Sequence, residues 1–222
     1  MRVLYVSFVV IVLDQLTKFL VKGLNIGWLG IHLQGMPYGT SRRFVGELVR
    51  ITFIENPGMA FGLDVGLRMI LISFTIIAAI IILYYLYKHR SDSVLLRLAL
   101  AFIFAGAMGN LIDRSFYGLI YGYAPVFYGK VVDFVQVEFW DFTFLGHTYT
   151  TWPIFNVADL SVTMGFLIIL VFNKKIFRSH VEEKTEVIAE ENTIANNNDV
   201  HNPDVIDNKT TGIAPLRIED SK

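Results

Sequence analysis

Apolar residues along the chain gather into four runs that polar segments separate. The runs cover about residues 3–22, 67–87, 95–112 and 156–172. Each is close to the length of about 20 apolar residues that a helix needs to cross the hydrocarbon core of a bilayer. The pattern therefore predicts four transmembrane helices in an integral membrane protein.

The first run has some features of a cleaved signal peptide, because Arg2 precedes an apolar segment. No small-residue cleavage site follows, however, and Asp14 and Lys18 interrupt the run before apolar sequence resumes. We interpret the run as a retained membrane helix.

Two long connections join these runs, residues 23–66 and 113–154. Within them, "ELVRITFIEN" (47–56) and "GKVVDFVQVEFW" (129–140) are rich in β-branched and aromatic residues, which predicts strands. The second connection also holds many Tyr and Trp residues, which favour the headgroup layer of a membrane. We expect both connections to lie on the membrane surface.

The chain divides by composition into a membrane domain, residues 1–178, and a tail, residues 179–222. The tail is polar and has few aromatic residues, which is typical of a disordered segment. The connection "KHRSDSVLLR" and the segment "NKKIFR" after the fourth run are basic, so both should be cytoplasmic, together with both termini. The arginines at 42, 43 and 50 weigh against this orientation.

Composition supports the membrane assignment and removes several function classes. The 222 residues are 54% hydrophobic and 18% charged, and the mean hydropathy is +0.50. Soluble domains are less apolar and more charged. The net charge of -1 gives no indication of nucleic-acid binding. The absence of cysteine excludes a thiol nucleophile, thiolate metal ligands and disulfides.

Polar residues from several segments converge on one side of the membrane in this topology. Ionisable groups inside membrane helices are costly and usually functional. In the expected orientation all of these polar residues lie toward the outer leaflet, and together they form one group. The group consists of Asp14 and Lys18 in the first run, Asn110 and Arg114 at the end of the third, Asn156 and Asp159 at the start of the fourth, and Asn56 and Asp133 in the two long connections.

Structural roles could account for single members of this group. Asp14 and Lys18 could form only an ion pair within their helix, and Arg114 could extend only to the headgroups. Asn156 could serve only as a helix cap. The glycines of "GAMGN" (106–110) could serve only close helix packing. Asp133 is harder to explain in this way, because it shares one face of the expected strand with Val131, Val135, Val137 and Phe139. A carboxylate on such an apolar face needs a partner or a proton.

Carboxylates are the best candidates for chemistry in this chain. There is no G-x-S-x-G or H-E-x-x-H motif, and the five histidines are dispersed, so serine hydrolase and zinc chemistry have little support. Two aspartates that lie close together cannot both ionise cheaply, so one holds a proton while the other acts as a base. Such a pair can hydrolyse a peptide bond through a water molecule without a metal or cofactor.

Five sequence blocks resemble the lipoprotein signal peptidase family, signal peptidase II, over about residues 5–175. The blocks occur in order along the chain: "LDQLTK" (13–18), "ENPGMAFG" (55–62), "GAMGNLIDR" (106–114), "VVDF" (131–134) and "FNVADL" (155–160).

The resemblance implies an aspartic endopeptidase of the bacterial inner membrane that acts at the outer leaflet, facing the periplasm. Its substrates would be diacylglyceryl-modified prolipoproteins, cut just before a lipid-modified cysteine. The fold would be four transmembrane helices with a small periplasmic β-cradle and a lid. It also implies contact with membrane lipid, inhibition by globomycin and no cofactor, and we expect a monomer.

By block matching, the catalytic residues would be Asp133 and Asp159. The supporting residues would be Asp14, Lys18, Asn56, Gly106, Asn110, Arg114, Asn156 and Ala158. Asp113 could be mistaken for a third catalytic acid, but its neighbour Arg114 favours an ion pair or a loop anchor. Two aromatic insertions, residues 115–131 and 138–155, could form a lid or bind a partner.

Two other classes of function remain as alternatives. A small transporter or channel would carry polar groups through the whole membrane depth, whereas the inner halves of the last three runs are apolar. A non-catalytic assembly subunit would tolerate the loss of either aspartate.

Overall fold

The computed structural model describes residues 2–58, 65–88, 90, 93–144 and 147–176, with the side chains at 28, 65–67, 140–144 and 147–150 left out. The chain divides into two units, Met1–Ile176 and Phe177–Lys222. The second unit, and with it the tail expected at residues 179–222, lies outside the described residues.

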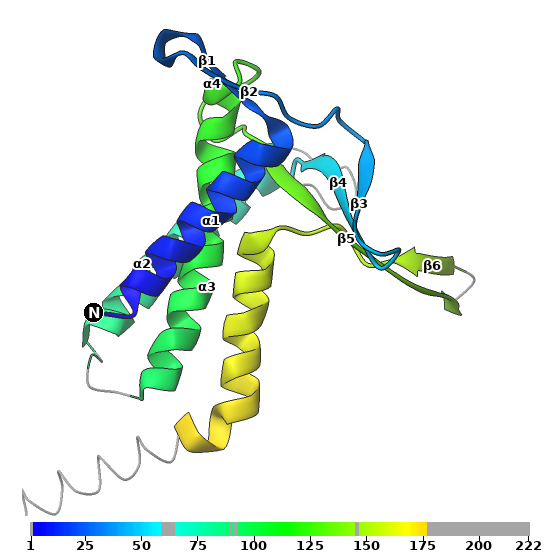
Figure 1. Cartoon of the computed structure of the whole chain (residues 1–222). Coiled ribbons are helices and arrows are strands. Elements are labelled where there is room, and N and C mark those ends of the chain that lie inside the picture. The colour runs from blue at the N-terminus through cyan, green and yellow to red at the C-terminus, as the bar shows by residue number, and fades with distance from the viewer. Residues whose placement is uncertain (1, 59–64, 89, 91–92, 145–146, 177–222) are drawn as a thin grey trace, which may run out of the picture. The chain divides into compact units, whose positions relative to one another are not determined.

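Among the described residues, four helices are long and apolar enough to cross a membrane, which confirms the predicted fold class. At most 28% of the residues in any of these spans are buried inside the protein, as expected where outer faces meet lipid. The helices are α1 (Leu4–Lys22), α2 (Val65–Lys88), α3 (Val94–Ile112) and a last helix, Val157–Ile176, drawn in yellow in Figure 1.

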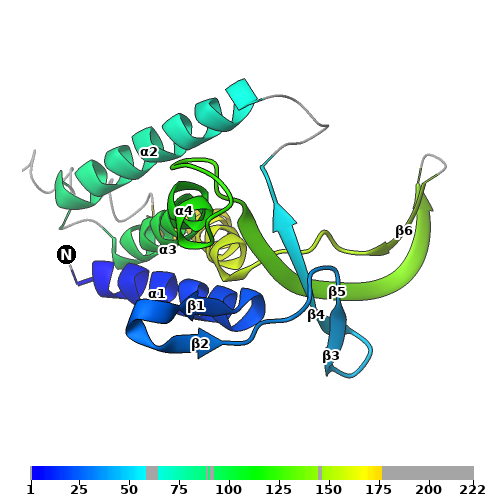
Figure 2. The same cartoon turned by 90° about the horizontal axis from the view of Figure 1, so that it is seen from above.

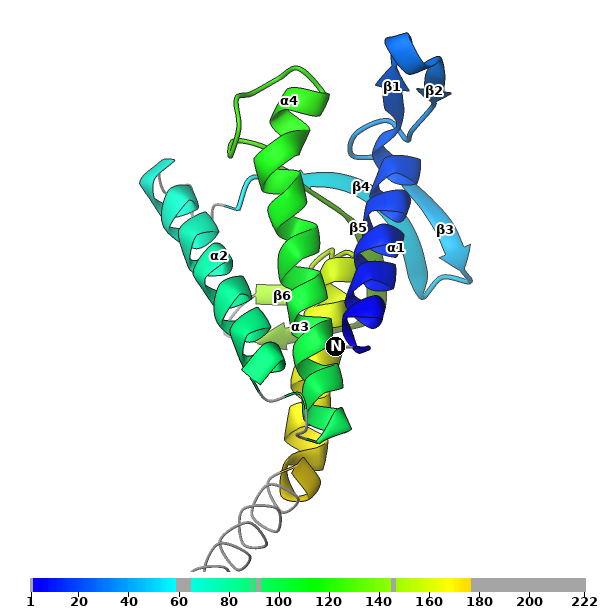
Figure 3. The ribbon, with the colours of Figure 1, turned by 90° about the vertical axis from the view of Figure 1, so that its left-hand side faces the viewer.

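Helix α3 lies between α1 and α2, as Figure 3 shows, and it also packs closely against the last helix. Single buried hydroxyls join these helices. Ser7 on α1 donates to the carbonyl of Ala101 at 2.8 Å, and Ser161 on the last helix donates to that of Phe102 at 2.7 Å. A Cβ on Gly106 would overlap the carbonyl oxygen of Ala158. Glycine is therefore required there for the two helices to approach.

The third helical segment is longer than the sequence predicts. We expected it to end near residue 112, but it continues through a π-helical turn, η3 (Asp113–Tyr117), and a short helix, α4 (Gly118–Ile120). The polar start of η3 resembles the beginning of a loop, yet Asp113, Ser115 and Tyr117 are all buried against other elements. Tertiary partners therefore keep residues 113–120 helical, and π-helical turns are often found at functional sites.

A four-stranded antiparallel sheet, in the order β3-β4-β5-β6, lies beside the helices (Figure 2). The predicted strands at 47–56 and 129–140 are confirmed, and the second continues further than expected. A separate two-stranded hairpin follows α1. The strands are β3 (Ser41–Val45), β4 (Val49–Asn56), β5 (Val131–Phe144) and β6 (His147–Thr151), and the hairpin consists of β1 (Leu24–Ile26), the 3-10 turn η1 (Gly27–Leu29) and β2 (Ile31–Leu33).

A hydrophobic cluster holds the sheet against the helices. It joins the end of α1, the turn η3 and the paired strands β4 and β5. Burying these large side chains together fixes the start of β5 beside η3. The buried members are Val21, Phe53, Tyr117, Val132 and Phe134.

Candidate active site

Backbone pairing with β5 brings the start of the last helix beside Asp133. Asp133 lies on β5 opposite Ile54 of β4. Two residues further along, Val135 donates its N–H to the carbonyl of Phe155 at 2.7 Å and accepts the Phe155 N–H at 3.1 Å. The last helix begins directly after this isolated bridge, so Asn156 and Asp159 lie next to Asp133.

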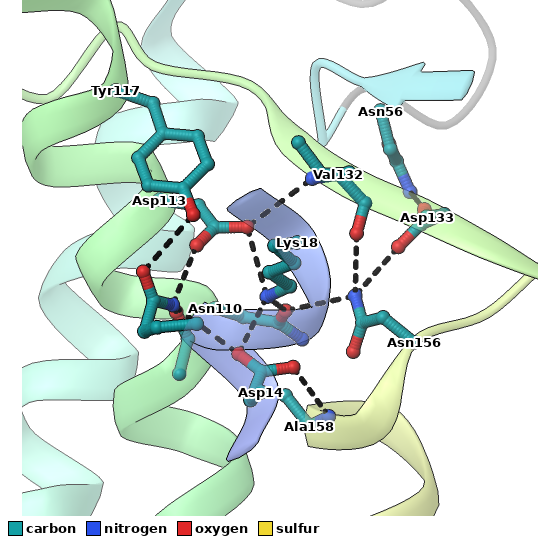
Figure 4. Close-up of polar contacts among 12 residues, drawn as sticks. Asp14, Lys18, Asn56, Asn110, Asp113, Tyr117, Val132, Asp133, Asn156 and Ala158 are labelled. Atoms are coloured by element: carbon teal, nitrogen blue, oxygen red, sulfur yellow. Dashed lines mark hydrogen bonds and ion pairs between the residues drawn. The ribbon is translucent and has the colours of Figure 1, made fainter. Parts of the chain in front are cut away.

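The Asp133 carboxylate is buried, with only 2% of the residue exposed, and each oxygen accepts an amide hydrogen bond (Figure 4). Asn156 Nδ2 donates to Oδ1 at 2.6 Å, and Asn56 Nδ2 donates to Oδ2 at 3.1 Å. Burial, followed by the negative charge of Asp159, raises the pKa of Asp133 to about 6. This carboxyl group therefore changes its protonation state close to neutral pH.

The Asp159 carboxylate is half-buried and also accepts two hydrogen bonds. Asn110 Nδ2 donates to its Oδ1 at 2.8 Å, and the backbone N–H of Asn156 donates to its Oδ2 at 3.2 Å. In return, Asn156 Oδ1 accepts the N–H of Asp159 at 3.0 Å. This reciprocal pair is a capping box at the start of the last helix. Asn156 is thus a helix cap, as one interpretation of the sequence expected, and it also binds Asp133.

Lys18 fixes the direction in which the asparagine amides point. Asn110 Oδ1 accepts from Lys18 Nζ at 3.1 Å and from Asn156 Nδ2 at 3.1 Å. An ammonium group can only donate, so the Asn110 oxygen faces Lys18 and its Nδ2 faces Asp159. Each aspartate therefore meets amide donors.

Lys18 lies between two buried carboxylates. Its Nζ is 2.8 Å from Asp14 Oδ2 and 2.8 Å from Asp113 Oδ2, and all three side chains are fully buried. The second oxygen of Asp14 accepts the N–H of Ala158 at 2.9 Å, which ties α1 to the last helix. The expected pair of Asp14 and Lys18 is confirmed, but it belongs to a larger network. Buried charges persist in proteins when they are paired in this way.

Asp113 has the expected kind of role but a different ion-pair partner. The partner is Lys18 on α1 rather than the adjacent Arg114. Asp113 also accepts the backbone N–H of Val132 at 3.1 Å, so the alternative expectation of an anchor is confirmed.

Arg114 lies at the site and has an unused donor. Its Nε is buried and, among the residues that the structure describes, has no hydrogen-bond partner. A Cβ on Gly58 would lie 3.4 Å from this Nε, an ordinary van der Waals contact, so the backbone at Gly58 lies against the guanidinium group. The positive charge interacts with Asp159 and Asp133.

Two small residues allow the helices at the site to approach one another. A Cβ on Gly109 would lie 2.5 Å from Asp14 Oδ2 and 3.0 Å from the Cβ of Ala158. Gly106 packs in the same manner one turn earlier.

The structure brings all ten residues selected from the sequence into one region.

Sequence reasoning missed two members of the network, Gln15 and Tyr117. Gln15 Nε2 donates to Asp113 Oδ1 at 2.9 Å, and the Tyr117 hydroxyl donates to Gln15 Oε1 at 3.0 Å. Gln15 is a polar residue within an apolar run, which could have identified it. Tyr117 looked like one aromatic residue among many.

Within the described ranges, no three His, Cys, Asp or Glu residues are grouped so as to hold a metal ion.

Comparisons with known proteins identify the family. A family model described as signal peptidase (SPase) II matches residues 6–174. The lipoprotein signal peptidase of Chlorobium phaeobacteroides (strain BS1) is 36% identical over 170 residues, which is 76% of this chain and 92% of that protein. That of Pelodictyon phaeoclathratiforme is 32% identical over 172 residues, 78% of this chain and 89% of that protein.

The fold gives the same result. A solved structure of a bacterial membrane enzyme at 1.9 Å resolution matches with a TM-score of 0.58 and 28% identity, and the match covers 77% of this chain and 90% of that one. The family expected from the five sequence blocks is therefore confirmed: the chain belongs to the signal peptidase II family of membrane proteases.

Proposed function

We propose that this protein removes the signal peptide from bacterial prolipoproteins whose cysteine carries a diacylglyceryl group, by aspartic-type hydrolysis. The observation that carries the proposal is the position of Asp133 and Asp159. They come from different elements, and both are bound to Asn156. The family supports the substrate class, and the paired carboxylates support the reaction type.

The active form of the enzyme carries a proton on Asp133, because burial and the charge of Asp159 raise the pKa of this group to about 6. Asp159 acts as the general base. Asn110 and the Asn156 backbone stabilise its charge by hydrogen bonding.

The reaction then follows from these roles. Asp159 takes a proton from a water molecule, whose oxygen attacks the carbonyl carbon of the scissile peptide bond. Asp133 gives its proton to the carbonyl oxygen, which yields a neutral tetrahedral diol. When the diol collapses, the C–N bond breaks, Asp159 gives its proton to the leaving amine, and Asp133 recovers a proton from a diol hydroxyl.

Arg114 orients the substrate in this scheme. Its guanidinium group interacts electrostatically with both carboxylates, and its Nε has no hydrogen-bond partner in the part of the chain that the structure describes. A planar array of donors suits a peptide carbonyl or a carboxylate better than an ammonium group does. Arg114 therefore positions the carbonyl that is to be cut.

The location of the buried charges supports a site at the outer leaflet of the inner membrane, facing the periplasm, with both termini cytoplasmic. Asn110 lies near the end of α3 and Asp159 in the first turn of the last helix, so both occupy the same end of the bundle. A substrate with acyl chains can reach such a site laterally from membrane lipid. The remaining parts of the proposal are a monomeric state and inhibition by globomycin.

The same location argues against a transporter or channel. The charged residues that are buried in the described part of the chain are Asp14, Lys18, Asp113 and Asp133, and they all belong to the network at the site. An ion path would need such groups along the whole membrane depth.

The test is processing of a diacylglyceryl-modified precursor in cells that lack their own enzyme. Asp133→Asn and Asp159→Asn should each abolish cleavage, while Ser7→Ala, which removes a distant buried hydrogen bond, should process normally. A precursor without the diacylglyceryl group should remain uncut. Normal processing by either aspartate variant would refute the aspartic mechanism, and globomycin should block the native enzyme.

A further inference from the structure

One edge of β5 is bound by side chains at the residue that precedes Asp133. Strand β4 pairs along the other edge of β5. On this edge, the N–H of Val132 donates to Asp113 Oδ2 at 3.1 Å, and its carbonyl accepts from Asn156 Nδ2 at 3.3 Å. Two side chains therefore occupy the place that a neighbouring strand would take, as Figure 4 shows.

The Asp113 carboxylate is held rigidly for this role. Lys18 Nζ binds its Oδ2 at 2.8 Å, and Gln15 Nε2 binds its Oδ1 at 2.9 Å. The hydroxyl of Tyr117 donates to Gln15 Oε1, which leaves the Gln15 amide nitrogen facing Asp113. Asp113 and Tyr117 are fully buried, so the acceptor that meets Val132 cannot change its position freely.

A second contact fastens the same stretch of chain to η3. The N–H of Gly129 donates to the carbonyl of Arg114 at 2.9 Å. A Cβ on Gly129 would overlap the carbonyl oxygen of Asp113, so glycine is needed for this close approach. The chain that leads to Asp133 is thus attached at two points to the residues that begin η3.

We propose that Asp113 is a positioning residue for peptide cleavage. Through the N–H of Val132 it fixes the backbone beside Asp133, and so it fixes where the Asp133 carboxyl group stands relative to the attacked carbonyl. This inference rests on the proposed function, because it requires Asp133 to be catalytic. A displacement of about 1 Å at a reacting group can reduce a rate about a hundredfold.

Asp113 and Asn156 act on Asp133 in different ways. Asn156 binds the Asp133 carboxylate directly, whereas the contact of Asp113 nearest to Asp133 along β5 is with the backbone N–H of the preceding residue. Loss of Asp113 should therefore leave substrate binding intact and slow the chemical step.

The experiment compares Asp113→Leu with Asp113→Asn in the purified full-length enzyme with a diacylglyceryl-modified precursor. Leucine removes the acceptor at similar volume, and asparagine keeps an oxygen that can accept the Val132 N–H. We expect the leucine variant to lower kcat about a hundredfold with KM within about twofold. The kcat of the asparagine variant should be at least about tenfold higher than that of the leucine variant. Ser7→Ala is the control for losing a buried hydrogen bond.

Hydrogen–deuterium exchange of the peptide that contains Val132 supplies a second measurement. Exchange there should be faster in Asp113→Leu, and to a smaller degree in Asp113→Asn, than in the native enzyme. If the leucine variant does not fold, kcat and exchange at Val132 are compared between the asparagine variant and the native enzyme. A lower kcat of the asparagine variant without faster exchange at Val132 would overturn the inference.

Other outcomes separate this inference from the proposed function. A kcat for folded Asp113→Leu equal to that of the native enzyme would overturn the positioning role. A rise in KM at constant kcat would do the same, since it indicates a binding role. Asp133→Asn, measured in parallel, should be inactive. If it cleaves the precursor, the proposed mechanism has failed rather than the positioning inference alone.

Discussion

Asn156 and Asp159 exchange hydrogen bonds across the first turn of the last helix: Asp159 donates its N–H to Asn156 Oδ1 at 3.0 Å, and Asn156 donates its N–H to Asp159 Oδ2 at 3.2 Å. The proposed general base is therefore also half of a capping box. Its carboxylate is held by the local folding of the helix.

This double role can be separated by substitution at Asn156. Serine is about as good a cap as asparagine, but it lacks the amide that binds Asp133. We expect Asn156→Ser to be about 1 kcal/mol more stable than Asn156→Ala, because only serine keeps the cap. Both should lower kcat about a hundredfold, because a donor to Asp133 is lost. Thermal unfolding and steady-state kinetics measure the two effects, and an active serine variant would contradict the assignment.

Asp133→Asn should make the folded protein more stable at neutral pH. The pKa of Asp133 rises on folding from 3.8 to about 6, so the folded state binds the proton more tightly. Below about pH 4 both states are protonated and the effect vanishes. Above about pH 6 the folded state carries the full penalty of ionisation, about 3 kcal/mol. The gain in melting temperature should therefore be present at pH 7.5 and disappear as the pH falls from 6 to 4.

The control for that experiment is Glu47→Gln, because Glu47 is exposed and should show no such pH-dependent gain. A melting temperature of Asp133→Asn that lies below the native value at pH 7.5 would contradict a raised pKa.

The pH dependence of cleavage should respond to Asn56. In the proposed mechanism Asp133 must be protonated, so kcat/KM of the native enzyme should decline with a midpoint near pH 6, the pKa of Asp133. The hydrogen bond from Asn56 lowers this pKa. Asn56→Ala should therefore raise the pKa and move the alkaline limb to higher pH, besides lowering the rate. A limb that moves to lower pH would be inconsistent with this role.

Gly109→Ala should damage the buried network. The added methyl group would lie 2.5 Å from Asp14 Oδ2, so α1 or α3 must shift. Overpacking of this kind destabilises proteins by about 1–3 kcal/mol, and activity should fall with it. Gly27→Ala is a matched control, since a Cβ there has nothing within 4 Å. Melting temperatures of the two variants should differ clearly, and equal values would argue against close packing at Gly109.

The sequence predicted the helices and two of the strands well where the signal is local. Apolar runs of membrane length and alternating strands identify the helices and β4 and β5. The polar residues inside those runs, such as Asp14, are among those that the fold brings together. A carboxylate within an apolar segment is informative because it needs partners wherever it lies.

The remainder depends on contacts between distant segments. The extension of the third helix through η3 is not evident locally, because Asp113 reads as the beginning of a loop until Lys18 is placed beside it. Tyr117 gains its role only from its contact with Gln15. The pairing of Phe155 with Val135 involves two residues whose types carry no signal for it.

The occupied edge of β5 also limits how a substrate can be recognised. Strand β4 lies on one side of Val132, and the side chains of Asp113 and Asn156 take both backbone groups on the other. A bound peptide thus has no free backbone there to pair with as an extra strand. Soluble recognition domains often bind peptides by such strand addition. In the proposed function, a substrate peptide therefore reaches Asp133 without pairing with Val132 as an added strand.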